Sequence, residues 1–96
     1  MFSPDVGMMV RCYSSQRGPL AFRNILDQLE PDEREVALLM RDNVSADYII
    51  AAIARQVSDR YGDGPTSAEI QSAANRFIGV HLPKLRAAFS RAFVGA

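Results

Sequence analysis

The chain holds one histidine, His81, and one cysteine, Cys12, so few of its side chains suit nucleophilic or acid–base chemistry. Ser–His catalysis needs the histidine next to an activated serine and an orienting acid. His81 instead adjoins Leu82 and Pro83 at an expected helix junction, which favours a structural or surface role. A zinc site would have to rely on carboxylates that lack ligand spacing. We therefore expect neither enzyme activity nor a metal or cofactor.

Charge is unevenly distributed along the chain although the formal net charge is zero. Residues 27–35 contain five acids and one base, and residues 70–96 contain four bases and no acid. The acids are expected on a solvated helix face, whereas general acid–base chemistry needs a buried carboxyl pair with separated pKa values. Zero net charge argues against a strongly basic nucleic-acid coat protein. The basic C-terminal part suits nucleic acid or an acidic protein partner, or it serves solubility alone.

Helical periodicity runs through most of the chain and predicts an all-α fold. Apolar residues recur at i, i+3, i+4 and i+7, with breaks at proline and glycine. The expected helices cover residues 19–29, 31–42, 45–61, 66–79 and 83–94. The third is the longest and has the widest apolar face, so we expect it to be the central, most buried helix. These elements predict a compact bundle of about five helices.

Local signals mark where the later helices begin and end. The Gly62–Pro65 stretch indicates a turn between the third and fourth helices. The Thr66–Glu69 stretch has the residues of a capping box, which starts the fourth helix. Gly79 together with Pro83 is expected to close the fourth helix and open the fifth.

The length fits one domain. Residues 1–18 lack clean periodicity and are expected to form a flexible or extended N-terminal arm, so that residues 19–96 make up a single helical domain. The lone Cys12 excludes an intramolecular disulfide and suits a reducing cytoplasm. No apolar run approaches the ~18–20 residues that span a bilayer, and Pro4 and Asp5 do not fit a signal peptide. We expect a cytoplasmic protein without membrane contact.

Two short helices joined at a tight break are expected between Leu29 and Ile50. The stretch has the order Leu-x-Pro-x-Glu-Arg-Glu-Val, then a turn that ends in serine, then a helix with isoleucine. The residues are Leu29, Pro31, Glu33, Arg34, Glu35, Val36, Leu39, Val44, Ser45 and Ile49. Over these positions the chain resembles the C-terminal DNA-binding domains of LuxR-type response regulators and small helix-turn-helix regulators of phages and actinobacteria. Asn43 stands where that family has a turn glycine, and asparagine also accepts a left-handed backbone.

The resemblance implies a small DNA-binding regulator of transcription, derived from a phage. In the family the recognition helix begins sooner after the turn serine than the fourth helix does here. The difference arises because the helix expected at residues 45–61 of this chain is longer than its counterpart. We therefore take the helix at residues 66–79 as the recognition candidate. The residues expected to contact double-stranded DNA are Gln71, Ser72, Asn75, Arg76, Lys84, Arg86 and Arg91. Glutamine and asparagine pair with adenine and arginine with guanine, while the cations of the fifth helix are expected on phosphates.

Three features count against the DNA hypothesis. Glu69, near the start of the fourth helix, would repel phosphate, and the polar residues there also fit an ordinary solvated helix face. With about four cationic contacts, tight binding by a monomer is not expected, and a homodimer is the favoured binding unit.

The competing hypothesis is a small helical module or inhibitor that binds a protein partner. Phe89, Phe93 and Val94 would then form a partner or dimer surface, with burial in the core as the alternative for them. Salt separates the two classes, because DNA binding weakens steeply with added salt and an apolar interface hardly responds.

Overall fold

The described part of the chain begins with a helix at residue 6, where the sequence predicts an arm. The computed structural model describes residues 6–57 and 64–94, apart from the side chain of Val94. Helix α1 spans Val6–Gln28. Val6, Val10 and Tyr13 are buried on one face of it. The arm expected at residues 1–18 is therefore wrong from residue 6 onward, because Val6, Val10 and Tyr13 form a buried stripe that too few apolar residues mark in the sequence. Residues 1–5 lie outside the described part.

Helix α1 is sharply kinked at Gly18. This residue has φ 87° and ψ 173°, a conformation that residues with a Cβ rarely adopt. Pro19 follows as the first residue of the second half, where its missing N–H leaves no helical hydrogen bond unmade. The helix predicted over residues 19–29 is thus confirmed as the second half of α1, which ends at Gln28.

Arg34 ties the end of α1 to helix α2, which spans Pro31–Arg41. Its Nε donates to the carbonyl oxygen of Leu26 over 3.0 Å, and its Nη2 donates to that of Leu29 over 3.2 Å. The last carbonyl groups of a helix have no partner further along the helix. The arginine of the Glu-Arg-Glu-Val stretch therefore has a structural role at this corner.

A tight turn joins α2 to helix α3, which spans Ala46–Val57. Asn43 adopts φ 62°, and its amide donates to the carbonyl oxygen of Met40 over 3.0 Å. A left-handed residue just after the helix is a common way to cap its carbonyl end. Ser45 Oγ then accepts from the amide of Tyr48 over 3.3 Å and caps α3. The predicted break with its left-handed asparagine is confirmed.

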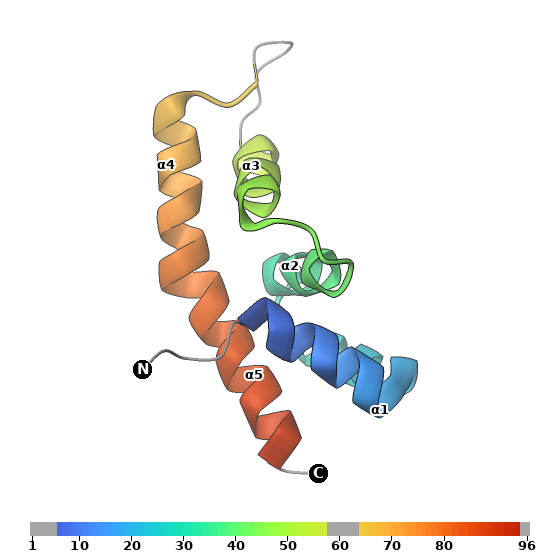
Figure 1. The fold of residues 1–96 in the computed structure, drawn as a ribbon. Helices are drawn as coiled ribbons and strands as arrows, with labels where there is room; N and C mark the ends of the chain where they lie inside the picture. Colours follow the sequence, from blue (N-terminus) through green and yellow to red (C-terminus); the bar gives the residue numbers. More distant parts are fainter. Residues whose placement is uncertain (1–5, 58–63, 95–96) are drawn as a thin grey trace, which may run out of the picture.

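Helix α3 lies at one side of the bundle rather than at its centre (Figure 1). Its buried residues are Ile49, Ile53 and Ala54. Tyr48 and Val57 on the same helix are 57% and 61% exposed, and the helix packs mainly against α4. The prediction that residues 45–61 form the central, most buried helix is wrong, because the main core forms between α1, α2 and the C-terminal helices. Residues 58–61 lie outside the described part.

One continuous helical run covers residues 67–94 and is the longest element in Figure 1; we call it the rod. It consists of α4 (Ser67–Arg76), the π-helical turn η1 (Phe77–His81) and α5 (Leu82–Val94). The predicted capping box at its start is confirmed. Thr66 Oγ1 accepts from the Glu69 amide over 3.2 Å, and Glu69 Oε1 accepts from the Thr66 amide over 2.7 Å.

The π-helical turn explains why Gly79 and Pro83 do not interrupt the rod. In an α-helix, proline lacks a donor and its ring collides with the carbonyl four residues earlier. Here the amide of Leu82 donates to the carbonyl oxygen of Phe77, five residues back, and this wider turn makes room for the ring. The predicted break between residues 79 and 83 is therefore wrong. The described residues form four helical units, α1, α2, α3 and the rod, in place of five.

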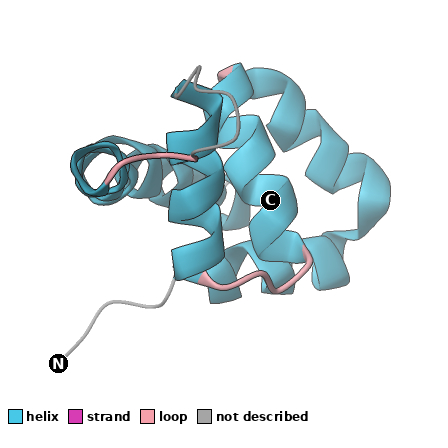
Figure 2. Ribbon diagram, turned by 90° about the horizontal axis from the view of Figure 1, so that it is seen from above, coloured by secondary structure: helices cyan, strands magenta, loops and turns pink. Residues whose placement is uncertain are grey.

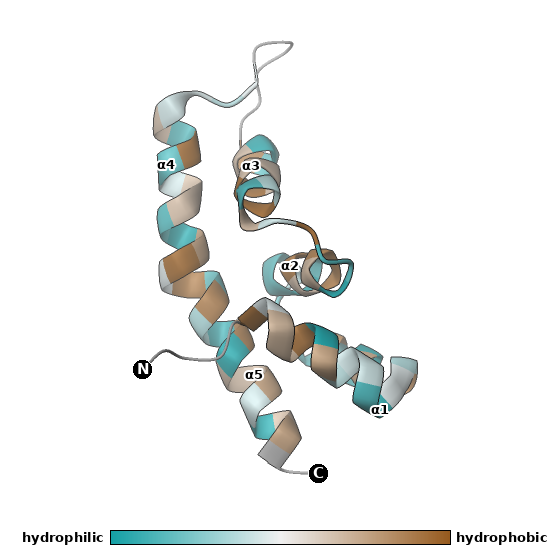
Figure 3. Cartoon of the chain, in the orientation of Figure 1, coloured by the Kyte–Doolittle hydropathy of each residue, from teal (hydrophilic) through white to brown (hydrophobic). Residues whose placement is uncertain are grey.

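The main core lies where α1, α2 and the rod meet. Tyr13 packs edge-on against Phe89 and Phe93, with ring centroids 5.5 and 5.2 Å apart, and Phe22 lies 5.9 Å from Phe89. Only helices and loops appear among the described residues (Figure 2), and apolar segments alternate with polar ones along them (Figure 3). The radius of gyration is 14.1 Å, near the ~13 Å of a globular chain of this size. The predicted all-α, compact fold is confirmed.

Candidate functional site

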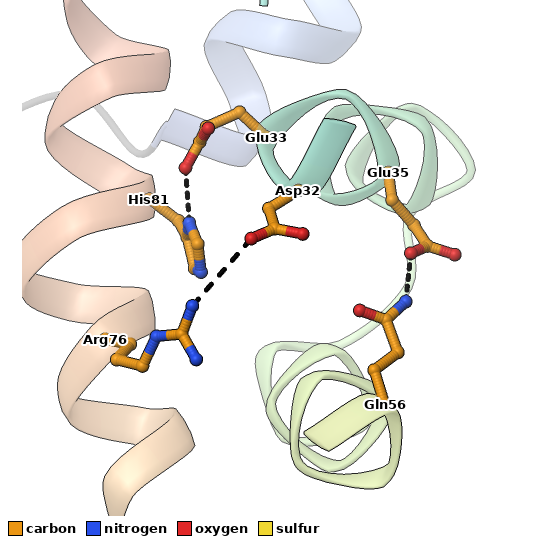
Figure 4. Close-up of polar contacts among 6 residues, drawn as sticks. All are labelled: Asp32, Glu33, Glu35, Gln56, Arg76 and His81. Carbon is orange, nitrogen blue, oxygen red and sulfur yellow. Dashed lines mark hydrogen bonds and ion pairs between the residues drawn. The ribbon is translucent and has the colours of Figure 1, made fainter. Parts of the chain in front are cut away.

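A buried histidine–carboxylate pair joins α2 to the rod. Nδ1 of His81 and Oε2 of Glu33 are hydrogen-bonded at 2.5 Å (Figure 4). Each residue is 2% exposed. The prediction that the acids of residues 27–35 lie on a solvated face is therefore wrong for Glu33. Of the two roles expected for His81, the structural one fits its burial and the surface one is wrong. A charged or polar pair at this depth costs free energy unless both groups are hydrogen-bonded.

Helix periodicity positions both members of the pair. Glu33 precedes Val36, Ala37 and Met40 at helical spacing, and all four are buried on the same face of α2. On the rod, His81 stands four residues before the fully buried Leu85. Each residue thus carried a signal of burial in the sequence, as a polar member of an otherwise apolar stripe.

Two further polar contacts lie near the pair, one between α2 and the rod and one between α2 and α3 (Figure 4). Arg76 Nη2 lies 3.8 Å from Oδ2 of Asp32, with about half of each side chain exposed. Gln56 on α3 donates to Glu35 on α2. Exposed polar contacts of this kind contribute little to stability. Their side chains surround the space between α2, α3 and the rod.

That space is a small pocket of about 200 Å³. Its apolar wall consists of Val36, Leu39, Ile49, Ala52, Ile53 and Val57. Its polar residues are Asp32, Glu35, Gln56, Arg76 and His81. Pockets that hold drug-sized ligands measure roughly 300–1,000 Å³, so this one is sized for a smaller molecule.

The pocket offers little for covalent catalysis. None of its lining residues is a serine, threonine, cysteine, lysine or tyrosine, and a histidine base without a nucleophile or a bound reactant has nothing to activate. No cluster of three or more potential metal-ligating side chains occurs among the described residues. The chemistry available here is hydrogen bonding at the second ring nitrogen of His81, beside an apolar wall.

Of the four base-reading candidates, Gln71 and Asn75 lie together on the outer surface of α4, while Ser72 and Arg76 line a small pocket against α3. Gln71, Ser72, Asn75 and Arg76 are all exposed. Gln71 Nε2 donates to Oδ1 of Asn75 over 3.2 Å, which places the two amides side by side one helical turn apart. Arg76 differs from the others because its guanidinium faces Asp32 across the pocket between α2, α3 and the rod.

The three phosphate-binding candidates are exposed but do not form one patch. Lys84 and Arg91 line the same shallow pocket beside Glu30. Arg86 is two residues from Lys84 and therefore points to a different side of α5. At a rise of about 1.5 Å per residue, Lys84 lies about 14 Å and Arg91 about 24 Å beyond Asn75 along the rod. Arg91 is thus remote from the base-reading residues.

The residues proposed for a partner surface divide between core and surface. Phe89 is fully buried, 0% exposed, against Tyr13 and Phe22. It therefore belongs to the core, and the alternative that it forms a partner surface is wrong. Phe93 is partly buried. The side chain of Val94 is outside the described part.

Comparison of the chain with models of known protein families, with curated proteins and with solved structures gave no match. Within residues 6–57 and 64–94, no helix has the length and apolar character to cross a membrane.

Proposed function

We propose that the chain is a small DNA-binding regulator, acting as a homodimer, with α4 as the recognition helix. The observation that carries this proposal is the exposed amide pair Gln71–Asn75 on the outer face of α4. Two adjacent amides on one exposed helix face suit bidentate recognition of adenine edges in the major groove. A helix held against the bundle by α3 also presents these side chains at a fixed orientation.

The electrostatics of the rod favour approach to a phosphate backbone. After Glu69 the chain has no acidic residue. The Glu69 carboxylate accepts from the amide of Thr66 in the capping box, but Glu69 also lines a small pocket beside Ser72 and Arg76, so its negative charge opposes phosphate binding on that side of α4. Lys84 and Arg86 are the phosphate candidates within reach of a half-site centred on Asn75, and Arg91 is too distant for that role.

Binding is expected to depend on salt in proportion to the number of phosphate contacts. With Lys84 and Arg86 on phosphates, a plot of log K against log salt has a slope of about −1.8 per protomer, from about −0.9 for each contact. The measurement is fluorescence anisotropy of labelled random duplex DNA over a range of salt concentrations, with the oligomeric state measured in the same buffer.

Lys84→Ala should reduce the magnitude of that slope by about 0.9 and weaken binding to all sequences alike. Arg23→Ala is the matched control, since Arg23 is equally exposed but lies on α1, and it should leave the slope unchanged. If the two variants behave alike, net charge rather than the rod governs binding. Absence of binding at low salt would contradict the proposal.

The alternative, a module that binds a protein partner, has one supporting observation. Ile78 and Val80 in the π-helical turn are 62% and 41% exposed, on different sides of the rod because they are two residues apart. Exposed apolar side chains of this kind can belong to interfaces. A complex formed through either of them would persist at high salt, unlike the DNA complex.

A further inference from the structure

The pocket between α2, α3 and the rod contains a buried polar atom that the described residues leave without a hydrogen bond. His81 uses Nδ1 for Glu33, and its Nε2 points away from that carboxylate, toward the side of Asp32 and Arg76 (Figure 4). His81 lines the pocket although it is only 2% exposed. A buried ring nitrogen is costly to leave unpaired, so the geometry calls for an occupant that bonds to it.

We propose that this pocket binds a small alcohol with a compact apolar body. The hydroxyl group would bond to Nε2 of His81, and the apolar body would contact the wall formed by Ile49, Ile53 and the side chains around them. A hydroxyl can both donate and accept, so it pairs with Nε2 in either protonation state of the ring. An apolar wall with one fixed polar group is the usual composition of a ligand pocket.

The charges on the rim select against ionised ligands. Asp32 and Glu35 carry negative charge at the edge of the pocket, and Arg76 carries positive charge. A carboxylate ligand would be repelled by the two acids, and an ammonium group would have to lie near the guanidinium. A neutral hydroxyl avoids both costs. The volume of about 200 Å³ limits the ligand to a molecule of fragment size.

The position of the pocket couples its occupant to the arrangement of the helices. Its walls come from α2, α3 and the rod, so an occupant changes how firmly α4 is held against the α2–α3 pair. If α4 reads DNA, the ligand would then alter DNA affinity. That consequence depends on the proposed function, whereas binding of the alcohol does not.

The test is a titration of the DNA-free full chain with cyclohexanol as the probe. Binding is monitored by NMR of the labelled isoleucine methyl groups. Saturable shifts are expected at Ile49 and Ile53, with a dissociation constant in the millimolar range. Ile25 on α1 lines a different pocket and should not respond. Cyclohexanecarboxylate should bind at least tenfold more weakly than cyclohexanol, because of the acids on the rim.

Two variants make the result specific. His81→Asn keeps an amide near the position of Nδ1 for Glu33 but has no counterpart of Nε2, and it should weaken cyclohexanol about tenfold. Ala52→Leu leaves the Glu33–His81 pair intact, fills the pocket and should abolish the shifts. The proposal would be overturned if the shifts persisted in Ala52→Leu. It would also be overturned if Ile49 and Ile53 showed no shifts up to the solubility limit of cyclohexanol. The DNA assays decide the proposed function separately.

Discussion

Replacing Glu33 with alanine is expected to lower the free energy of unfolding by about 1–3 kcal/mol, the cost of leaving a buried hydrogen-bonding group unpaired. The variant leaves His81 buried without its partner, and the side chains of both residues are 3% exposed. Total stabilities of about 5–15 kcal/mol are normal for a domain, so this change removes an appreciable part of the margin. Urea denaturation followed by circular dichroism measures the effect.

Two controls separate the lost pairing from the lost volume. Glu33→Gln keeps a hydrogen-bond acceptor for His81 Nδ1 and should lose less stability than Glu33→Ala. The double variant Glu33→Leu/His81→Leu removes both polar groups and should also lose less, because apolar replacements of a whole buried pair are often tolerated. A loss below about 1 kcal/mol for Glu33→Ala, the size typical of an exposed pair, would contradict the described burial.

Phe89→Ala is expected to lower the free energy of unfolding by about 3–5 kcal/mol, since truncation of a buried phenylalanine leaves a cavity. Phe89 contacts the rings of Tyr13 and Phe22, so the loss would loosen α5 against both halves of α1. Thermal and urea denaturation of the purified variant measure this loss.

Phe93→Ala is the matched control, because Phe93 contacts Tyr13 but is only partly buried. It should cost clearly less than Phe89→Ala. If Phe89→Ala left stability unchanged and instead abolished binding of a partner, Phe89 would belong to an interface and its place in the core would be wrong.

Signals that act over a few residues could be predicted from the sequence. The Ser45 cap, the left-handed Asn43 and the Thr66–Glu69 box each depend on hydrogen bonds between near neighbours, so the residue types alone specify them. The same applies to Pro19 after the kink at Gly18. Such signals place the ends of helices well because the physics that sets them is local.

Features decided by packing could not be predicted in this way. Pro83 is a local break signal, yet Leu85 and Phe89 pack into the core, and a π-helical turn keeps the rod continuous at this point. Glu33 and His81 are 48 positions apart, and although each stripe indicates burial, nothing in a single sequence says that they meet. The pocket forms where α2 and the rod come together at this contact. It could not be predicted because the contact itself could not be.

Selection of duplexes from a randomised DNA pool would show whether Gln71 and Asn75 on α4 read bases, as we propose. The wild-type protein should enrich a short motif that contains adenine. Asn75→Ala should relax the preference at one adenine position, at a cost of about 1–3 kcal/mol for the preferred sequence. Asn24→Ala, which removes the same exposed amide from α1, should enrich the wild-type motif. No enrichment over the input pool at low salt, or the same motif from Asn75→Ala, would contradict the account.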